Sequence, residues 1–356
     1  MPHKQRLEKF ESVVSGISGG ATMIIAQLDP DALAATITLR EIIRSRKSGN
    51  GFRTRIFFGG AIGHPQNKAI VNKFDLAAQL RPIKEFSAEH NQNVVLVDSS
   101  VANDGRLALP AGLSIDPVIV IDHHRGGNIQ ESEKKFVWIE DIGAVSTMAV
   151  ELAKMAGFEF SPDQPMLPLL LATGIYTDTG GLIDCSSRDR EAFNYVTSIV
   201  GGADLVGLFR YPLPASHFEN VKRALSQMEI QGGKLVTNLG VVRPDEGDDL
   251  ATISDYLIRM QGITLVVVWA IIDTPEKDKR MVRISARNAD ITSDLGAFLR
   301  ETFPEGSSGA KVSAYGQGIG GGTVNLGLGF WLTRDTAEQA VALVGKLIHT
   351  RIFSRL

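Results

Sequence analysis

Short runs rich in β-branched and aromatic residues alternate with longer helical patterns between about Gly20 and Ala203, and this alternation limits the fold more than any other feature. Strands that alternate with helices are joined by right-handed crossovers into a parallel sheet. The sequence therefore predicts an α/β fold with a parallel sheet in its first half. The β-rich runs are ATMIIAQ, TRIFFGG, NVVLVDSS and PVIVIDHH, and the helical patterns are DALAATITLREIIRSRK, HPQNKAIVNKFDLAAQL and STMAVELAKMAG.

The second half of the chain is organised differently. After Asp204 the alternation stops, and a proline-containing stretch leads into strands and helices separated by glycine-rich loops. A chain of 356 residues is also long enough to bury two cores. We expect a first domain at 1–205, a linker at 206–230 and a smaller α/β domain at 231–356.

Composition excludes several classes of protein. The formal net charge is -3, so no overall basic field would recruit long nucleic acid, although a short or mononucleotide ligand needs only a local patch. The single cysteine, Cys185, excludes an intrachain disulfide framework. No apolar stretch is long enough to span a bilayer, and the first residues lack the apolar core of a signal peptide. We expect a cytoplasmic protein that does not bind membranes, with a homodimer left open.

Carboxylates and imidazoles gather where the predicted strands end. Because the carboxyl ends of parallel strands share one edge of a sheet, these side chains should lie together there. One segment, LPLLLATGIYTDTG, fits a helix that unwinds into a loop as well as it fits a buried strand. The residues concerned are Asp29 and Asp31, Asp98, the run Asp122, His123 and His124, and Asp178.

Each of these residues also has an ordinary structural explanation, as a helix cap or a turn residue. Taken together they are harder to explain in that way, because clustered carboxylates repel one another unless a cation lies between them. Mixed Asp and His ligands suit manganese, magnesium or zinc. Two such ions can clamp a phosphoryl group and activate water.

At this point the chain resembles the DHH phosphoesterases, a family that includes RecJ-type exonucleases, oligoribonuclease/PAP phosphatases, cyclic-dinucleotide phosphodiesterases and family II pyrophosphatases. Four motifs match in order: DPDALA, LVDSS, IDHH and TGIYTDTGG. The second half resembles the DHHA1 domain more loosely, through RISAR and GQGIGGG. The resemblance implies a DHH domain followed by a DHHA1-like domain, with an active-site cleft between them.

The resemblance also implies roles for individual residues. Asp98 would bridge two metal ions, with Asp31, His123 and Asp178 completing one site and Asp29 contributing to the other. His124 would contact the phosphate or protonate the leaving oxygen, and Asp122 would orient an imidazole. In the second domain, Arg287 and Gly320, Gly321 and Gly322 would hold the substrate. The implied cofactor is Mn²⁺ or Mg²⁺, with up to two ions.

Two positions depart from the family pattern. Ile25 stands where relatives carry a metal-binding histidine, which weakens one metal site, and Thr323 follows the glycines where relatives carry another histidine. Two hypotheses therefore remain. The chain is either a metal-dependent phosphoesterase that cleaves a small nucleotide or short oligonucleotide with metal-activated water, or a nucleotide-binding sensor that has lost catalysis.

The glycines at Gly316, Gly318 and Gly321 match a dinucleotide-binding pattern only superficially. That pattern must lie between a strand and a helix, whereas VNLGLGF, which follows here, has the pattern of a strand. We expect instead a glycine-rich loop between strands. Its amides would cradle an anion, and the alternative is a loop without a ligand.

Overall fold

A computed structural model describes residues 3–47, 51–60, 62–101, 104–124, 127–275, 280–290, 292–312, 316–327, 332–333 and 335–354. The chain divides into two compact units, Met1–Pro212 and Leu213–Leu356. The division falls inside the predicted linker, 206–230, but this segment is helical for much of its length. It contains the end of α7 (Gly202–Phe209), the whole of α8 (Ala215–Ser226) and the start of β7 (Glu229–Gln231).

Unit 1 is built on a six-stranded sheet in which every pair of neighbouring strands is parallel. The order is β3-β2-β1-β4-β5-β6, so the predicted parallel sheet is confirmed. The two strands that the sequence patterns did not indicate, β3 and β6, form its edges. The strands are β1 (Gly20–Ile25), β2 (Arg53–Phe58), β3 (Leu80–Pro82), β4 (Val94–Val97), β5 (Pro117–Asp122) and β6 (Phe136–Ile139).

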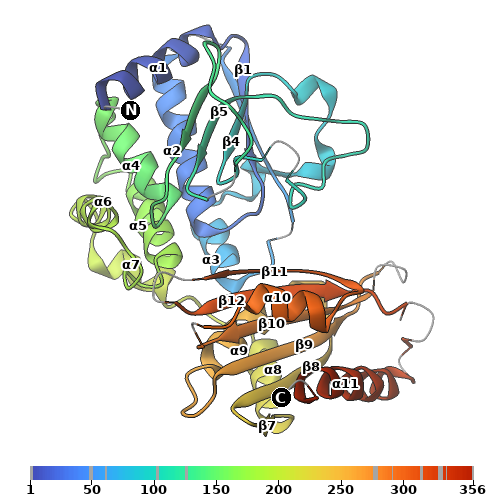
Figure 1. Cartoon of the computed structure of the whole chain (residues 1–356). Coiled ribbons are helices and arrows are strands. Elements are labelled where there is room, and N and C mark those ends of the chain that lie inside the picture. The colour runs from blue at the N-terminus through green and yellow to red at the C-terminus, as the bar shows by residue number, and fades with distance from the viewer. Residues whose placement is uncertain are drawn as a thin grey trace. The chain divides into compact units, whose positions relative to one another are not determined.

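Helices cover one face of this sheet, as Figure 1 shows for α1, α2, α4 and α5. Short 3-10 helices and loops cover the other face, where Phe57, Leu96 and Val120 are buried. Burial on both faces explains why the strands are apolar at nearly every position. The helices are α1 (His3–Gly16), α2 (Pro30–Arg46), α3 (Pro65–Lys73), α4 (Val145–Met155), α5 (Met166–Asp178), α6 (Ser187–Thr197) and α7, with η1 (Ala77–Gln79), η2 (Ile83–Glu85) and η3 (Ala88–His90).

Two helical patterns are now resolved. The ambiguous segment LPLLLATGIYTDTG forms a helix, α5, which ends at Asp178. The predicted helix over HPQNKAIVNKFDLAAQL ends early, at Lys73, because Asp75 adopts a left-handed conformation with φ of 48° that a helix cannot continue through.

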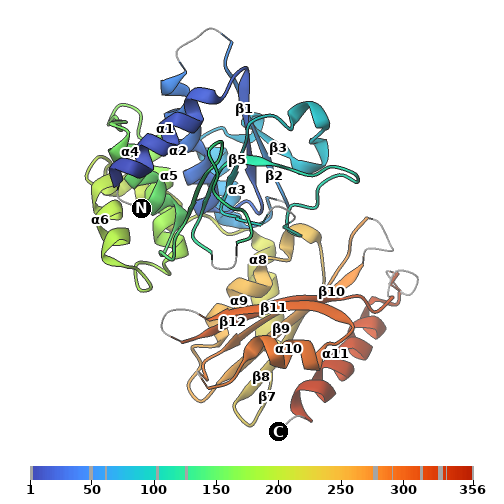
Figure 2. The same ribbon diagram turned by 45° about the horizontal axis from the view of Figure 1, so that its top comes forward.

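Unit 2 contains a mixed six-stranded sheet in the order β11-β12-β10-β9-β8-β7, in which only β8 and β9 run parallel. Figure 2 shows α10 and α11 on one face and α8 and α9 on the other, and each face has its own apolar core. The elements are β8 (Lys234–Val242), η4 (Pro244–Glu246), α9 (Asp249–Leu257), β9 (Leu265–Ile272), β10 (Met281–Asn288), α10 (Leu295–Thr302), β11 (Gly306–Val312), β12 (Gly318–Val324) and α11 (Ala337–Phe353).

Among the described residues no single helix is long and apolar enough to cross a membrane. One pair, α6 and α7, reaches the required length and composition together, but it is bent by 119°.

Candidate metal centre

The predicted acidic residues converge at the place where the strand order of unit 1 reverses. Strand β1 pairs with β2 on one side and with β4 on the other, which makes the carboxyl ends of β1 and β4 the switch point of the sheet. Asp29 and Asp31 follow β1, and Asp98 follows β4. The neighbouring strand β5 ends at Asp122, directly before the two histidines.

Asp98 has a left-handed backbone and a buried carboxylate oxygen that accepts no hydrogen bond. Its φ is 60°, a left-handed conformation that aspartate tolerates better than most residues. Its amide donates to the carbonyl of Ile121 at 2.9 Å, which fixes the turn. Among the described residues, Asp98 Oδ1 is buried without a hydrogen-bond partner. An orphaned buried carboxylate oxygen is costly unless a cation binds it.

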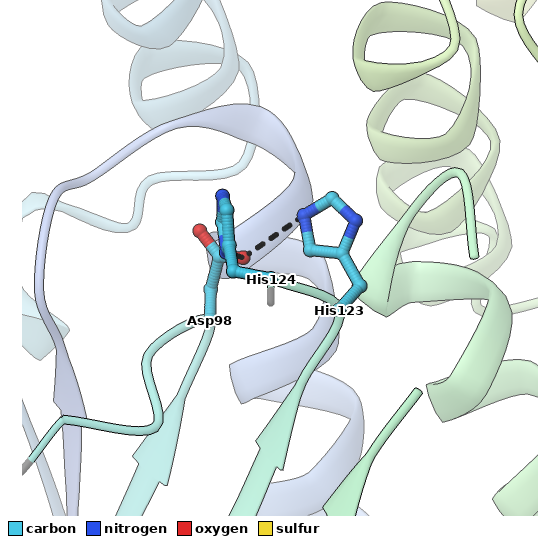
Figure 3. Close-up of side chains that lie close together, drawn as sticks. All are labelled: Asp98, His123 and His124. Atoms are coloured by element: carbon cyan, nitrogen blue, oxygen red, sulfur yellow. Dashed lines mark ion pairs between the residues drawn. The ribbon is translucent and has the colours of Figure 1, made fainter. Parts of the chain in front are cut away.

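His123 lies within reach of three carboxylates. Its Nε2 atom is 3.3 Å from Asp98 Oδ1, an ion pair drawn in Figure 3, and 3.3 Å from Asp178 Oδ2. Its Nδ1 atom lies 3.0 Å from the carbonyl oxygen of Ile142. Because a carbonyl only accepts, Nδ1 carries a proton and Nε2 is the nitrogen that would bind a metal ion.

The charge state of His123 depends on these neighbours. Burial lowers the pKa of the imidazole, but contact with Asp98 outweighs it. Together with the charges of Asp31 and Asp178, this contact raises the pKa of His123 to about 10. Without a bound cation, Nε2 therefore carries a proton. This proton lies where a metal ion would bind to Nε2.

His124 is held by Asp122. Asp122 Oδ1 accepts hydrogen bonds from the backbone amide of His124 at 3.0 Å and from its Nδ1 at 2.8 Å. Ser100 Oγ donates to Asp122 Oδ2 at 2.5 Å. Burial raises the pKa of Asp122, but these hydrogen bonds hold it below its ordinary value. The imidazole of His124 is 39% exposed and lies beside Asp98 in Figure 3. Its Nδ1 atom is 3.4 Å from Asp98 Oδ1.

Asp31 is fixed by the first turn of α4. Its Oδ2 accepts from the amide of Val145 at 2.7 Å and its Oδ1 from the amide of Ser146 at 2.8 Å. Asp31 thus caps α4 from a position 114 residues away. Burial and the neighbouring carboxylates raise the pKa of Asp31 to about 7, so a nearby cation would stabilise its charged form.

Asp178 reaches the centre from a helix and not from a strand. It is the last residue of α5, where the helix dipole disfavours a negative charge. This position is unfavourable for a carboxylate without a nearby cation, which supports a functional role.

Asp29 is the N-cap of α2, and its Oδ1 accepts from the amide of Ala32 at 2.8 Å. Burial and the charges of Asp98, Asp178 and Asp31 raise its pKa well above the ordinary value. Its predicted role as a ligand of a second ion stays a prediction. Ile25, which stands where relatives carry histidine, is fully buried in the apolar core beneath the helices.

Two overlapping groups of side chains could each hold a metal ion. One consists of Asp98, His123 and His124, and the other of Asp31, His123 and Asp178. Within each group the ligand atoms lie within 4.8 Å of one another. The buried oxygen of Asp98 without a hydrogen bond and the raised pKa values of Asp29, Asp31 and His123 fit a site that binds positive charge. The five residues of the two groups are called the candidate metal centre below.

The glycines predicted as a substrate loop are strand residues instead. Gly320, Gly321 and Gly322 lie within β12, paired on one side with β10 and on the other with β11. The loop prediction was wrong, because these residues pair with both neighbouring strands, and close packing accounts for glycine at these positions. A Cβ atom would lie 2.9 Å from Ala310 Cβ at Gly320, 2.6 Å from Ile284 O at Gly321 and 2.5 Å from Ser307 O at Gly322.

Arg287 is almost fully buried in β10. Its Nε and Nη2 atoms donate to the two oxygens of Asp255 at 2.5 and 3.1 Å, and its Nη1 donates to Ser285 Oγ and Ala286 O. Any phosphate that Arg287 binds must compete with Asp255. The predicted substrate-binding roles of Arg287 and the glycines stay predictions.

Several partners of the centre were not predicted from the sequence, namely Ser100, Ile142, Val145 and Ser146. Ile142 and Val145 act through backbone atoms, which carry no residue-specific signal, and Ser146 acts through both its amide and its Oγ. The fourth, Ser100, lies in LVDSS, and its position two residues after Asp98 was the available signal.

The fold and the site define an α/β protein with a candidate Asp/His metal centre at the switch point of a parallel sheet. Residues 22–175 match the DHH family, N-terminal domain, so unit 1 contains a DHH domain. It is 25% identical over 328 residues to an uncharacterised protein of Methanocaldococcus jannaschii, covering 91% of this chain and 61% of that protein.

Two further proteins are similar. A probable manganese-dependent inorganic pyrophosphatase of Deinococcus radiodurans is 25% identical over 181 residues, covering 50% of this chain and 52% of that protein. The crystal structure of an exopolyphosphatase-related protein from Bacteroides fragilis has a TM-score of 0.64 at 13% identity, covering 99% of this chain and 98% of that chain. This structural likeness confirms the two-unit fold. The chain spans less than two thirds of the length of both named sequence relatives.

Proposed function

We propose that the protein is a metal-dependent phosphoesterase that hydrolyses a phosphoester bond in a small nucleotide or short oligonucleotide. The observation that carries this proposal is the convergence of Asp31, Asp98, His123 and Asp178 around one point, where the buried Asp98 Oδ1 has no hydrogen bond and contacts only imidazole nitrogens among the described residues. The DHH domain supports the reaction class.

Manganese is the proposed cofactor. A site that combines several carboxylates with imidazole suits this ion, and a similar protein is a probable manganese-dependent enzyme by name. A bound divalent ion would stabilise negative charge on the phosphoryl oxygens and lower the pKa of a water molecule that it binds. We propose that Asp98 and His123 belong to the ligands of any ion bound here, with Asp31 and Asp178 completing one set.

His124 is proposed as the proton donor to the leaving oxygen. Its Nδ1 is held by Asp122, so Nε2 is the nitrogen that can face a substrate. The side chain is 39% exposed, in contrast to the 10% of His123, so a substrate can reach it. The role of Asp122 is to keep this imidazole in one orientation.

A second candidate function is nucleotide binding without hydrolysis. The observation that favours it is the buried Ile25, which offers no metal ligand at the end of β1, the strand before Asp29. A centre with one strong group of ligands could bind a metal–nucleotide complex and still lack the second ion that some phosphoesterases use.

One experiment distinguishes the two candidates. Protein purified with manganese is analysed for bound metal and tested on dinucleotides, 3′,5′-bisphosphonucleotides, cyclic dinucleotides and pyrophosphate. The Asp98→Asn variant serves as the inactive control, because asparagine also tolerates the left-handed backbone. Turnover that this variant loses supports the enzyme, whereas tight binding without turnover supports the second candidate. Protein that binds no manganese contradicts both.

A further inference from the structure

Arg106 lies on the segment that follows β4, at the same edge of the sheet as the candidate metal centre. Leu107 anchors this segment in the core. Gly59, directly after β2, packs so closely that a Cβ atom there would lie 2.6 Å from the carbonyl oxygen of Arg106 and 2.3 Å from that of Ala26. The segment is therefore fixed against the carboxyl ends of β1 and β2.

The guanidinium of Arg106 is held in place along one edge only. Nε and Nη2 donate to Asp104, at 3.0 and 2.7 Å to Oδ2, and Nη2 lies 3.4 Å from the main-chain oxygen of Asp98. Asp104 is itself fixed by a 2.8 Å hydrogen bond from Ser99 Oγ. Among the described residues Nη1 forms no hydrogen bond, and the side chain is 40% exposed. Nη1 can therefore donate a hydrogen bond to a ligand without giving up the contacts to Asp104.

The guanidinium lies among the carboxylates of Asp104, Asp98 and Asp122. Burial lowers the pKa of Arg106, but Asp104, Asp98 and Asp122 raise it above its ordinary value. A phosphate group that approached so many carboxylates would be repelled without positive charge beside it. Metal ions supply part of that charge, and in unit 1 the exposed edge of Arg106 is suited to supply more.

We propose that Arg106 binds a nonbridging oxygen of the phosphoryl group held at the candidate metal centre. This inference rests on the proposed function, because the phosphoryl group is that of the substrate. It places a phosphate-binding arginine in the DHH domain itself, in addition to the predicted role of Arg287 in unit 2. The Asp104 and Ser99 side chains act as positioning residues for the guanidinium.

The test is the binding of inorganic phosphate to the manganese-loaded full chain, measured by calorimetry. We expect Arg106→Gln to raise the dissociation constant for phosphate about tenfold or more, since it removes a charged hydrogen bond. Arg106→Lys should lose less, because it keeps the charge but not the planar fork. The matched control is Arg44→Gln, an exposed arginine on α2 paired with Glu41, which should bind phosphate like the parent.

Manganese affinity and the unfolding temperature of each variant separate binding from structure. They should stay close to the parent values for Arg106→Lys. Parent-like phosphate binding in both Arg106 variants, no phosphate binding by the parent, or a parallel loss of manganese and phosphate in both variants overturns the inference. Phosphate binding that depends on Arg106 in a protein without turnover leaves the inference standing and rejects the proposed hydrolysis. Turnover combined with parent-like phosphate binding by both variants overturns the inference and leaves the proposed hydrolysis standing.

Discussion

His123 carries a proton at the nitrogen that would bind a metal ion. Three carboxylates raise its pKa to about 10, so the ring is protonated at neutral pH when no cation is present. Metal binding must displace this proton, and the two events are therefore linked. The same carboxylates would bind the arriving ion.

This linkage predicts that manganese affinity rises with pH. Between about pH 7 and about pH 9, below the pKa of His123, the dissociation constant should fall about tenfold per pH unit for the single proton released. Below about pH 7 the dependence should steepen, because Asp31, with a pKa of about 7, also becomes protonated. Calorimetry in buffers of different ionisation enthalpy measures the protons released.

The control for this prediction is His349→Gln, which removes a histidine of unit 2 that pairs with Glu229. It should keep the pH dependence, whereas His123→Gln should bind manganese weakly at every pH. A dissociation constant that does not change with pH would mean that His123 is not a ligand.

A second prediction at this scale concerns His124. If His124 protonates the leaving oxygen, His124→Gln should slow cleavage of the best dinucleotide substrate by about 10²-fold or more. It should slow bis(p-nitrophenyl) phosphate far less, because nitrophenolate leaves without a proton. Steady-state rates on both substrates test this, with manganese affinity measured alongside. Equal losses on both would assign His124 to metal or phosphate binding instead.

At the scale of elements, the contact between α2, α4 and α5 holds the centre together. Gly174 in α5 allows this contact, since a Cβ atom there would lie 2.4 Å from Ser146 Oγ and 2.9 Å from Asp31 Cα. Ser146 and Asp31 are themselves joined by a hydrogen bond at the start of α4. The first glycine in TGIYTDTGG, Gly174, is therefore explained by packing.

Gly174→Ala should accordingly destabilise the protein by about 1–3 kcal/mol, despite the higher helix propensity of alanine. It should also weaken manganese binding, because it displaces Asp31. The matched control is Gly207→Ala in α7, where a Cβ atom would meet nothing within 4 Å. That variant should be as stable as the parent or more so. Thermal unfolding and manganese titration of both variants measure the difference, and a stable Gly174→Ala would show that α5 can shift freely.

The elements also show which features a sequence can predict. Strands such as Val94–Val97 and Pro117–Asp122 are almost continuously apolar, so their position and the edge at which they end could be predicted. The edge strand Leu80–Pro82 is too short to produce a pattern, whereas Phe136–Ile139 is as long as Val94–Val97 and was missed all the same. Glycine disfavours strands by propensity, which is why the strand through Gly320 to Gly322 was mistaken for a loop. Contacts such as Asp31 with Val145 depend on backbone atoms far apart in sequence.

At the scale of the whole molecule, the two units have separate apolar cores. The clusters around Phe57 and Met23 belong to Met1–Pro212, and those around Trp269 and Val268 belong to Leu213–Leu356. All five residues of the candidate metal centre lie in the first unit.

Calorimetric unfolding should therefore show two transitions. Manganese should raise the midpoint temperature of only one of them, the transition of unit 1. An ion present at about 100 times its dissociation constant stabilises the unit that binds it by about 2.7 kcal/mol. Trp138→Phe and Trp269→Phe, which remove a buried tryptophan from unit 1 and unit 2 respectively, identify the transitions by fluorescence. A single transition that shifts as a whole with manganese would show that the units unfold together.

Two requirements limit which amino acid can occupy position 98. A φ of 60° admits glycine, asparagine and aspartate with little strain. A negatively charged oxygen ligand admits only aspartate and glutamate. Aspartate alone satisfies both conditions, so a selection for activity from a library randomised at position 98 should return a single residue, whereas a selection for stability alone should return several.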